Sequence, residues 1–211
     1  MILYTYFRSS AAFRVRIALN LKGLTAEMRP INLLTKENRL AEYRTVNPQG
    51  FVPYLIDGEL RLAQSLAIIE YLDETRPNPP LLPATPAERA FVRGVATLIA
   101  CDIHPLNNTR VLDYLDSVLH VEKDQRSLWY QHWINEGFTV LEQLLAARPA
   151  STFCTGEAPS LADICLVPQV FNAQRFKVDV APYRRIMAIF EACMKVPAFD
   201  AAQPSRQPDA T

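Results

Sequence analysis

The first eighty residues alternate between short strand-like runs and helical ones. Residues 2–7 form a compact run of β-prone side chains, which predicts a strand. From Arg14 to Lys22 apolar residues recur on one side of a helix, and Gly23 is a natural residue to end it. A second strand is predicted over residues 26–31. The chain therefore begins in the order strand, helix, strand.

A hairpin and another helix come next. Residues 53–56 and 60–63 are strand-like and flank Asp57-Gly58, a strong two-residue turn signal. Ser65 is expected to cap the helix that follows. Because a tight hairpin joins antiparallel strands, the small α/β sheet of this half is expected to be mixed.

A proline-rich segment separates this half from the rest of the chain. Five prolines occur within residues 77–86, too many for a continuing helix, and they predict a stiff linker. Beyond it, apolar residues recur at helical spacing, most clearly at Ile134, Phe138, Leu141 and Leu145. We therefore expect two domains, an α/β domain over residues 1–80 and an all-helical domain over residues 87–211.

The second half carries three further local signals. Residues 88–119 are predicted to form a long helical stretch with a kink at Pro105. The segment from Ser160 to Asp163 has the form of a capping box that opens another helix. The last helix is predicted over residues 183–195, and the tail after Pro204 is expected to be polar and loose.

The charge balance narrows the classes of function. The chain has 22 Lys+Arg and 22 Asp+Glu, so its formal net charge at neutral pH is zero. No global basic field exists to attract nucleic acid or an acidic membrane. The N-terminal run does not have the form of a signal peptide, and no apolar run reaches the roughly 18 residues of a membrane span. We expect a cytoplasmic protein that binds neither nucleic acid nor membrane.

Cysteine spacing and common motifs exclude several chemistries. The four cysteines form no C-x-x-C pair, so they are interpreted as buried free thiols in a reducing cytoplasm. Cys101, Asp102 and His104 match no common zinc spacing, and no metal site is expected. The six glycines form neither a dinucleotide-binding motif nor a P-loop.

Candidate chemistry lies at two predicted helix starts. Ser9 and Ser10 lie between the first strand and the first helix, where backbone N–H groups favour an anion and a hydroxyl can donate to a thiolate. Gln64 and Ser65 lie at a second helix start, where a carboxylate could bind. Simple N-capping remains the alternative interpretation for both pairs.

These serines and Gln64 are separated by Val52-Pro53, a pair compatible with a cis peptide bond, although the residues alone leave the isomer open. With the proline linker and the helical second half, this order resembles the glutathione transferases, specifically the zeta class, over nearly the whole chain. The segments that carry the resemblance are Phe7–Ser10, Arg14–Leu19, Gln64–Leu72, Leu166–Val170, Arg175–Asp179 and Gln207–Asp209. The family commonly reads Ser-Ser-Cys at the first helix, whereas this chain has Ala11 at the third position. A role for that cysteine is therefore ruled out, and the serine role is retained.

The resemblance implies the glutathione-transferase fold, in which a thioredoxin-like α/β N-terminal domain precedes an all-α C-terminal domain. It also implies glutathione as cofactor and a homodimer as the assembly. Ser9 would hydrogen-bond the glutathione sulfur, with Ser10 nearby, and Val52 would offer backbone hydrogen bonds to the cysteinyl part. Gln64 and Ser65 would hold the γ-glutamyl end.

From the helical half, the resemblance implies contacts with the tripeptide or the substrate from His104, Asn108 and Arg110. Arg8 and Arg175 would face the carboxylates of the substrate, because a guanidinium pairs with a carboxylate bidentately and stays charged. Arg14 and Arg16 lie inside the first predicted helix and are assigned no chemistry.

The implied activity is glutathione-dependent cis–trans isomerisation of a maleyl diacid by reversible thiolate addition. Maleylacetoacetate, and hence aromatic amino-acid breakdown, is favoured over maleylpyruvate. The alternative enzyme is a general glutathione-conjugating transferase. Arg8 and Arg175 make this alternative less favoured, because two arginines suit a diacid substrate. A non-catalytic interaction module is least favoured, since Ser9, Gln64 and Ser65 are all present.

Overall fold

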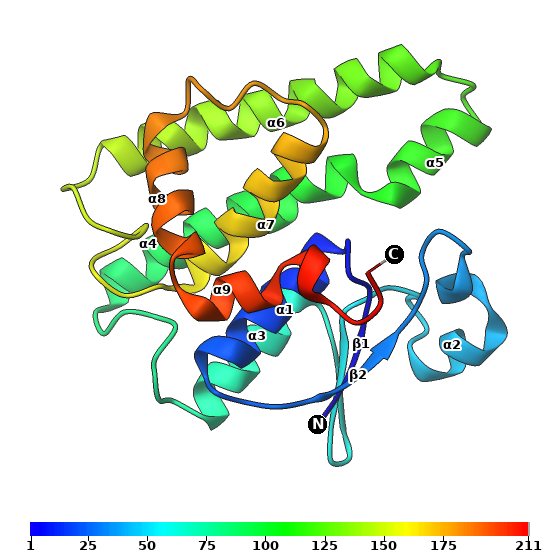
Figure 1. Ribbon diagram of the computed structural model, residues 1–211, viewed down its shortest axis with the longest axis horizontal. Coiled ribbons are helices and arrows are strands. Elements are labelled where there is room, and N and C mark those ends of the chain that lie inside the picture. The colour runs from blue at the N-terminus through cyan, green and yellow to red at the C-terminus, as the bar shows by residue number, and fades with distance from the viewer. Residues whose placement is uncertain (211) are drawn as a thin grey trace. The chain divides into compact units, whose positions relative to one another are not determined.

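A computed structural model describes residues 1–210 (Figure 1). Contacts divide the chain into two compact units. The first unit contains Met1–Leu81 together with the residues from Met194 onward, and the second contains Leu82–Cys193. The domain limits expected from the sequence, 1–80 and 87–211, stay a prediction.

The first unit is built on a four-stranded sheet with the order β2-β1-β3-β4. Its strands are β1 (Ile2–Thr5), β2 (Glu27–Pro30), β3 (Tyr54–Asp57) and β4 (Leu60–Ala63). β1 pairs with β2 in parallel and with β3 antiparallel, so that Leu3 lies opposite both Met28 and Leu55. Leu3 and Leu55 are fully buried. The predicted mixed sheet and the predicted hairpin are confirmed.

The first unit also contains helices from both ends of the chain. They are α1 (Ser10–Leu21), the 3-10 turn η1 (Glu37–Arg39), α2 (Ala41–Val46), α3 (Ser65–Thr75), α9 (Pro197–Ala202) and the 3-10 turn η4 (Pro204–Arg206). α1 packs against both α3 and α9. The helix predicted over 183–195 is confirmed as α8 (Arg184–Met194), but it is not the last one, because α9 and η4 follow, and the tail is not loose, because Asp209 accepts a hydrogen bond from the Phe7 N–H. Such short elements have weak local signals, and α9 is held by contacts with a helix from the other end of the sequence.

The second unit is helical. Its elements are α4 (Pro86–Thr97), the π-helical turn η2 (Leu98–Ile103), the 3-10 turn η3 (His104–Asn107), α5 (Thr109–Ser117), α6 (Lys123–Ala146), α7 (Leu161–Arg175) and α8 (Arg184–Met194), whose last residue belongs to the first unit. The predicted kink at Pro105 is confirmed and amounts to a full interruption, since Asn108 takes an extended conformation before α5 begins.

Two local signals of this unit are confirmed. The four apolar positions used to predict a helix all lie on α6 and are buried. The capping box at the start of α7 is complete: Asp163 accepts hydrogen bonds from the Ser160 N–H and hydroxyl, both at 2.8 Å. Asp163 also accepts from the Cys154 N–H at 2.8 Å, which ties the preceding loop to the helix start.

The four cysteines are all free, and three of them are buried. The expectation that every thiol is buried is wrong for Cys101, which lies in η2 beside the equally exposed Asp102. Burial raises the pKa of the Cys154 and Cys193 thiols well above the usual value, so these two remain protonated. Among residues 1–210, no helix combines the length and the apolar character needed to cross a bilayer.

Candidate active site

Ser9 is the N-cap residue of α1. Its backbone is extended, and its Oγ accepts a hydrogen bond from the Ala12 N–H at 3.2 Å. The capping alternative is therefore confirmed, but it does not compete with a chemical role. A hydroxyl that accepts from the backbone keeps its own proton and can still donate it to an anion.

The start of α1 favours negative charge. Its first turn contains no acidic side chain, and the positive end of the helix dipole lies there. Ser10 is the first helical residue and is buried. Arg8, just before Ser9, is half-buried and holds its guanidinium over the Phe7 ring at 4.8 Å from the centroid. A cation, a helix start and a hydroxyl donor thus occupy three consecutive positions of the chain.

Val52 lies in a fixed loop before β3. The Val52-Pro53 peptide bond is cis, the isomer that the sequence left open. The carbonyl oxygen of Phe51, one residue earlier, accepts from the Tyr43 hydroxyl at 2.5 Å and from Asn47 Nδ2 at 2.8 Å. Burial raises the pKa of Tyr43 to about 12, so its hydroxyl stays a donor at neutral pH. These two bonds set the orientation of the main chain that leads into Val52.

Gln64 and Ser65 lie at the start of α3, but Ser65 is not the residue that caps it. The prediction that Ser65 caps the helix is wrong, because Gln64 is the N-cap residue and Ser65 already lies in the helix. The reason is the backbone of Gln64, which has a φ of 71°, so the chain turns into the helix one residue earlier than expected. A positive φ is costly for a residue with a side chain, and such strain is concentrated at functional sites.

The side chains of Gln64 and Ser65 are tied to other parts of the first unit. Gln64 makes no capping bond and instead donates from Nε2 to Gln49 Oε1 at 3.2 Å. Ser65 is buried, and its Oγ accepts from Arg14 Nη1 at 3.4 Å. Arg14 lies on α1, so one buried guanidinium links α1 to the start of α3.

The second unit holds the remaining predicted site residues. His104 is the first residue of η3 and is half-buried. Asn108 is the N-cap residue of α5, and its Oδ1 accepts a hydrogen bond from the Arg110 N–H at 3.1 Å. Arg110 itself is exposed. Arg175 is the last residue of α7, is exposed, and lies 5.2 Å from the centroid of the Phe176 ring. Both exposed guanidinium groups are accessible from solvent.

Arg16 supports the site in a way the sequence did not reveal. Its side chain is buried, and it donates from Nη2 to the Phe7 carbonyl at 3.0 Å and from Nη1 to the Tyr6 carbonyl at 3.3 Å. Burial lowers its pKa to about 10, an effect opposed by the nearby charge of Asp209. The only sequence signal was a charged residue among the apolar positions of a predicted helix, which did not indicate its partners.

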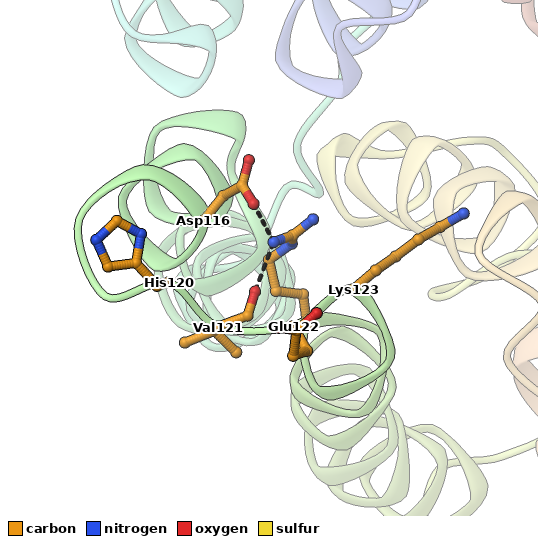
Figure 2. A pocket seen from close by; sticks show the side chains of 6 residues that line it. Asp116, His120, Val121, Glu122 and Lys123 are labelled. Atoms are coloured by element: carbon orange, nitrogen blue, oxygen red, sulfur yellow. Dashed lines mark hydrogen bonds and ion pairs between the residues drawn. The ribbon is translucent and has the colours of Figure 1, made fainter.

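A cavity of about 290 Å³ lies in the second unit and contains none of the predicted site residues (Figure 2). Its lining comes from Asp116, His120, Val121, Glu122, Lys123 and Arg126. Arg126 pairs with Asp116 and with the Val121 carbonyl, and Figure 2 shows Lys123 extending away from Asp116. Because its arginine is already paired, this cavity is a weak candidate for binding an acidic ligand.

Comparison with known proteins places the site in a family. The chain matches the glutathione S-transferase N-terminal domain over residues 1–74. A probable maleylacetoacetate isomerase of Vibrio cholerae serotype O1 is 50% identical over 212 residues, which cover 100% of this chain and 98% of the relative. The holo structure of a maleylpyruvate isomerase, a bacterial zeta-class glutathione S-transferase, matches with a TM-score of 0.98 at 43% identity over 100% of both chains. The chain belongs to the zeta-class glutathione transferases.

Another similar structure contains a bound ligand. The maleylacetoacetate isomerase of Anaeromyxobacter dehalogenans 2CP-1, solved with dicarboxyethyl glutathione and citrate in its active site, matches with a TM-score of 0.88 at 39% identity. The alignment covers 100% of this chain and 97% of that one. These likenesses confirm the predicted glutathione-transferase fold, with its thioredoxin-like first part and its helical second part.

Proposed function

We propose that this zeta-class transferase is a glutathione-dependent isomerase that converts a maleyl diacid from cis to trans. The observation that carries the proposal is the Ser9 hydroxyl, which caps α1 with its oxygen and keeps its proton for an anion. The relatives named as maleylacetoacetate and maleylpyruvate isomerases support the same reaction.

The first unit would hold glutathione through residues of both helix starts. Ser9 would donate to the sulfur, with Ser10 beside it, and the fixed main chain at Val52 would pair with the cysteinyl part. Gln64 and Ser65 would bind the γ-glutamyl carboxylate at the start of α3, where backbone N–H groups favour an anion. When bound, glutathione supplies a thiolate that adds reversibly to the double bond, permits rotation, and is expelled unchanged.

The contribution of Ser9 is to favour the thiolate over the thiol. A free thiol is mostly protonated at neutral pH, and only the thiolate is a good nucleophile. A hydrogen bond worth roughly 1.4 kcal/mol to the charged form lowers a pKa by about one unit. The positive end of α1 acts in the same direction, because its first turn contains no carboxylate.

The arginines would recognise the substrate. Arg8 and Arg175 would bind its carboxylates, and negative charge that develops on the conjugated carbonyl oxygen would also be stabilised by nearby cations. His104 and Arg110 would contact the substrate or the tripeptide, and Asn108 the tripeptide. The dicarboxyethyl glutathione bound by the Anaeromyxobacter relative joins the tripeptide to two carboxylates, which supports a site that accepts both.

Maleylacetoacetate is the proposed substrate, with maleylpyruvate as the alternative. The two differ only in the acyl tail, so a site that binds two carboxylates accepts both.

We also propose that the enzyme acts in the cytoplasm as a homodimer with domains at 1–80 and 87–211. Unpaired cysteines suit a reducing compartment, and sedimentation equilibrium that gives a monomer would contradict the assembly.

The decisive experiment follows the absorbance of maleylacetoacetate and of maleylpyruvate with the purified chain, with and without glutathione. The proposal predicts turnover only when glutathione is present, with maleylacetoacetate as the faster substrate. Glutathione binding without turnover of either diacid would contradict the isomerase and favour a conjugating transferase.

A further inference from the structure

The C-terminal turn folds back onto the segment that carries Ser9. Asp209 Oδ2 accepts a hydrogen bond from the Phe7 N–H at 2.9 Å, although 202 residues separate the two in the sequence. The next residue, Ala210, packs against a buried cluster that contains Tyr6, Phe7 and Val52. The turn therefore contacts the main chain two residues before Ser9 and the cluster to which Val52 belongs.

A second contact fixes the same segment through its carbonyl groups. Arg16 donates to the carbonyls of Phe7 and Tyr6 and, from Nη1, to Thr5 Oγ1 at 3.1 Å. Its Nε donates to the Ala202 carbonyl at the end of α9, at 3.1 Å. Arg16 thus joins the end of β1 to the C-terminal segment, and its guanidinium is close enough to Asp209 for their charges to interact.

These bonds leave Phe7 fixed through both of its main-chain polar groups. Its N–H is held by Asp209 and its carbonyl by Arg16. The Ser9 N–H then donates to the Tyr6 carbonyl at 2.9 Å, the oxygen that also accepts from Arg16. The position of the Ser9 hydroxyl therefore depends on a carboxylate and a guanidinium that do not touch it.

We propose that Asp209 is a positioning residue for Ser9, acting through the Phe7 N–H, and that the C-terminal turn thereby sets how strongly bound glutathione is held as thiolate. The inference rests on the proposed function, because it assumes that Ser9 faces the glutathione sulfur. A hydroxyl that moves away from the sulfur loses a short, directional hydrogen bond, whereas the binding of the rest of the tripeptide is unchanged.

The test is a pH titration of the ultraviolet absorbance of the thiolate in the glutathione complex, without any diacid. In Asp209→Ala the thiol pKa is expected to rise by about one unit, so that the thiolate fraction at a pH well below the native thiol pKa falls about tenfold. The kcat should fall by the same factor, whereas the KM for the diacid should change less than about twofold. Hydrogen exchange at the Phe7 amide of the free protein should become faster, because the amide loses its acceptor.

Two further variants separate positioning from general stability. Asp209→Asn keeps an acceptor oxygen at the same distance and should retain a thiol pKa close to that of the native chain. Asp209→Glu keeps the charge but displaces the carboxylate by one methylene, and it should behave more like Asp209→Ala. If Asp209→Ala does not fold, the thiol pKa values of Asp209→Asn and Asp209→Glu decide between the explanations. A thiol pKa that is closer to the native value in Asp209→Glu than in Asp209→Asn would overturn the proposal.

The matched control is Asp200→Ala, which removes the same charge from the same C-terminal segment. Asp200 bonds to Gln203 and Arg206, not to residues 5–9. A control that raises the thiol pKa as much as Asp209→Ala would contradict the proposal, as would a melting temperature that falls in Asp209→Ala while the pKa and kcat stay unchanged. Loss of thiolate in Asp209→Ala combined with no native turnover of diacid would retain the positioning role and refute the isomerase.

Discussion

The hydroxyl group at the N-cap of α1 makes one hydrogen bond in the structure and is proposed to make a second one with a ligand. The oxygen of Ser9 accepts from the Ala12 N–H and stabilises the helix, and its proton is left for a ligand. Ala11 stands where the family commonly has a cysteine, and the capping bond of Ser9 does not involve it. The family resemblance predicted the ligand role, and ordinary capping rules predicted the structural one.

Arg8 is the residue of the first unit that we propose to bind a carboxylate of the diacid. We predict that Arg8→Gln raises the KM for the diacid by roughly tenfold or more, because a charge-assisted hydrogen bond to a carboxylate contributes about 1.5–3 kcal/mol. The affinity for glutathione, measured by titration calorimetry, should change less. The control is Arg61→Gln, an exposed arginine on β4. If Arg8→Gln and Arg61→Gln changed the KM for the diacid equally, Arg8 would have no specific role in binding the diacid.

At the scale of elements, the sequence signals that predicted the structure correctly are those that involve only a few neighbouring residues. The hairpin around Gly58 and the capping box of Asp163 each depend on a turn or on two residues three positions apart. The sequence predicts the start of α3 one residue too late. The positive φ of Gln64 is not encoded by a local preference, because glutamine rarely adopts it.

One element contact should make the stability of the fold sensitive to acid. Asp57, at the end of β3, accepts from Arg76 Nη2 at 2.8 Å and from the Tyr71 hydroxyl at 2.9 Å. These hydrogen bonds, Arg76 first, lower the pKa of Asp57 below its usual value. The folded-state pKa is thus below the unfolded one. The resulting stability is present above about pH 4 and is lost as the pH falls through the folded-state value.

Urea unfolding at a series of pH values checks this contact. Asp57→Asn should lower the free energy of unfolding by less than about 1 kcal/mol near neutral pH, as expected for a partly exposed pair. The difference from the native chain should shrink as the pH falls below about 4. Glu59→Gln, an exposed carboxyl in the same hairpin, is the control. If the difference in the free energy of unfolding stayed constant across this pH range, the charge of Asp57 would not contribute to stability.

At the scale of the whole molecule, the sequence predicted the fold class but not the way the chain's ends meet. The strand order and the helical second half follow from periodicity and turn chemistry. The docking of α9 on α1 and the bond from Phe7 to Asp209 join residues far apart in the sequence, for which a single sequence has no signal. The support that Arg16 gives to the Ser9 segment is of the same kind, since three of its acceptors are main-chain carbonyls.

The central claim is that the Ser9 hydroxyl favours the glutathione thiolate, and Ser9→Ala tests it most directly. The measurement is the rate of glutathione-dependent isomerisation of maleylacetoacetate by this variant, compared with Thr85→Ala. Thr85 caps α4 through a bond from the Glu88 N–H at 3.3 Å, so its loss matches the structural cost of removing a cap, about 1 kcal/mol.

We predict that Ser9→Ala lowers kcat by roughly 100-fold or more, as for the loss of a donor to a developing or bound anion, and that Thr85→Ala leaves kcat within about twofold of the native value. A Ser9→Ala variant that is folded, binds glutathione and turns over at the native rate would contradict the account.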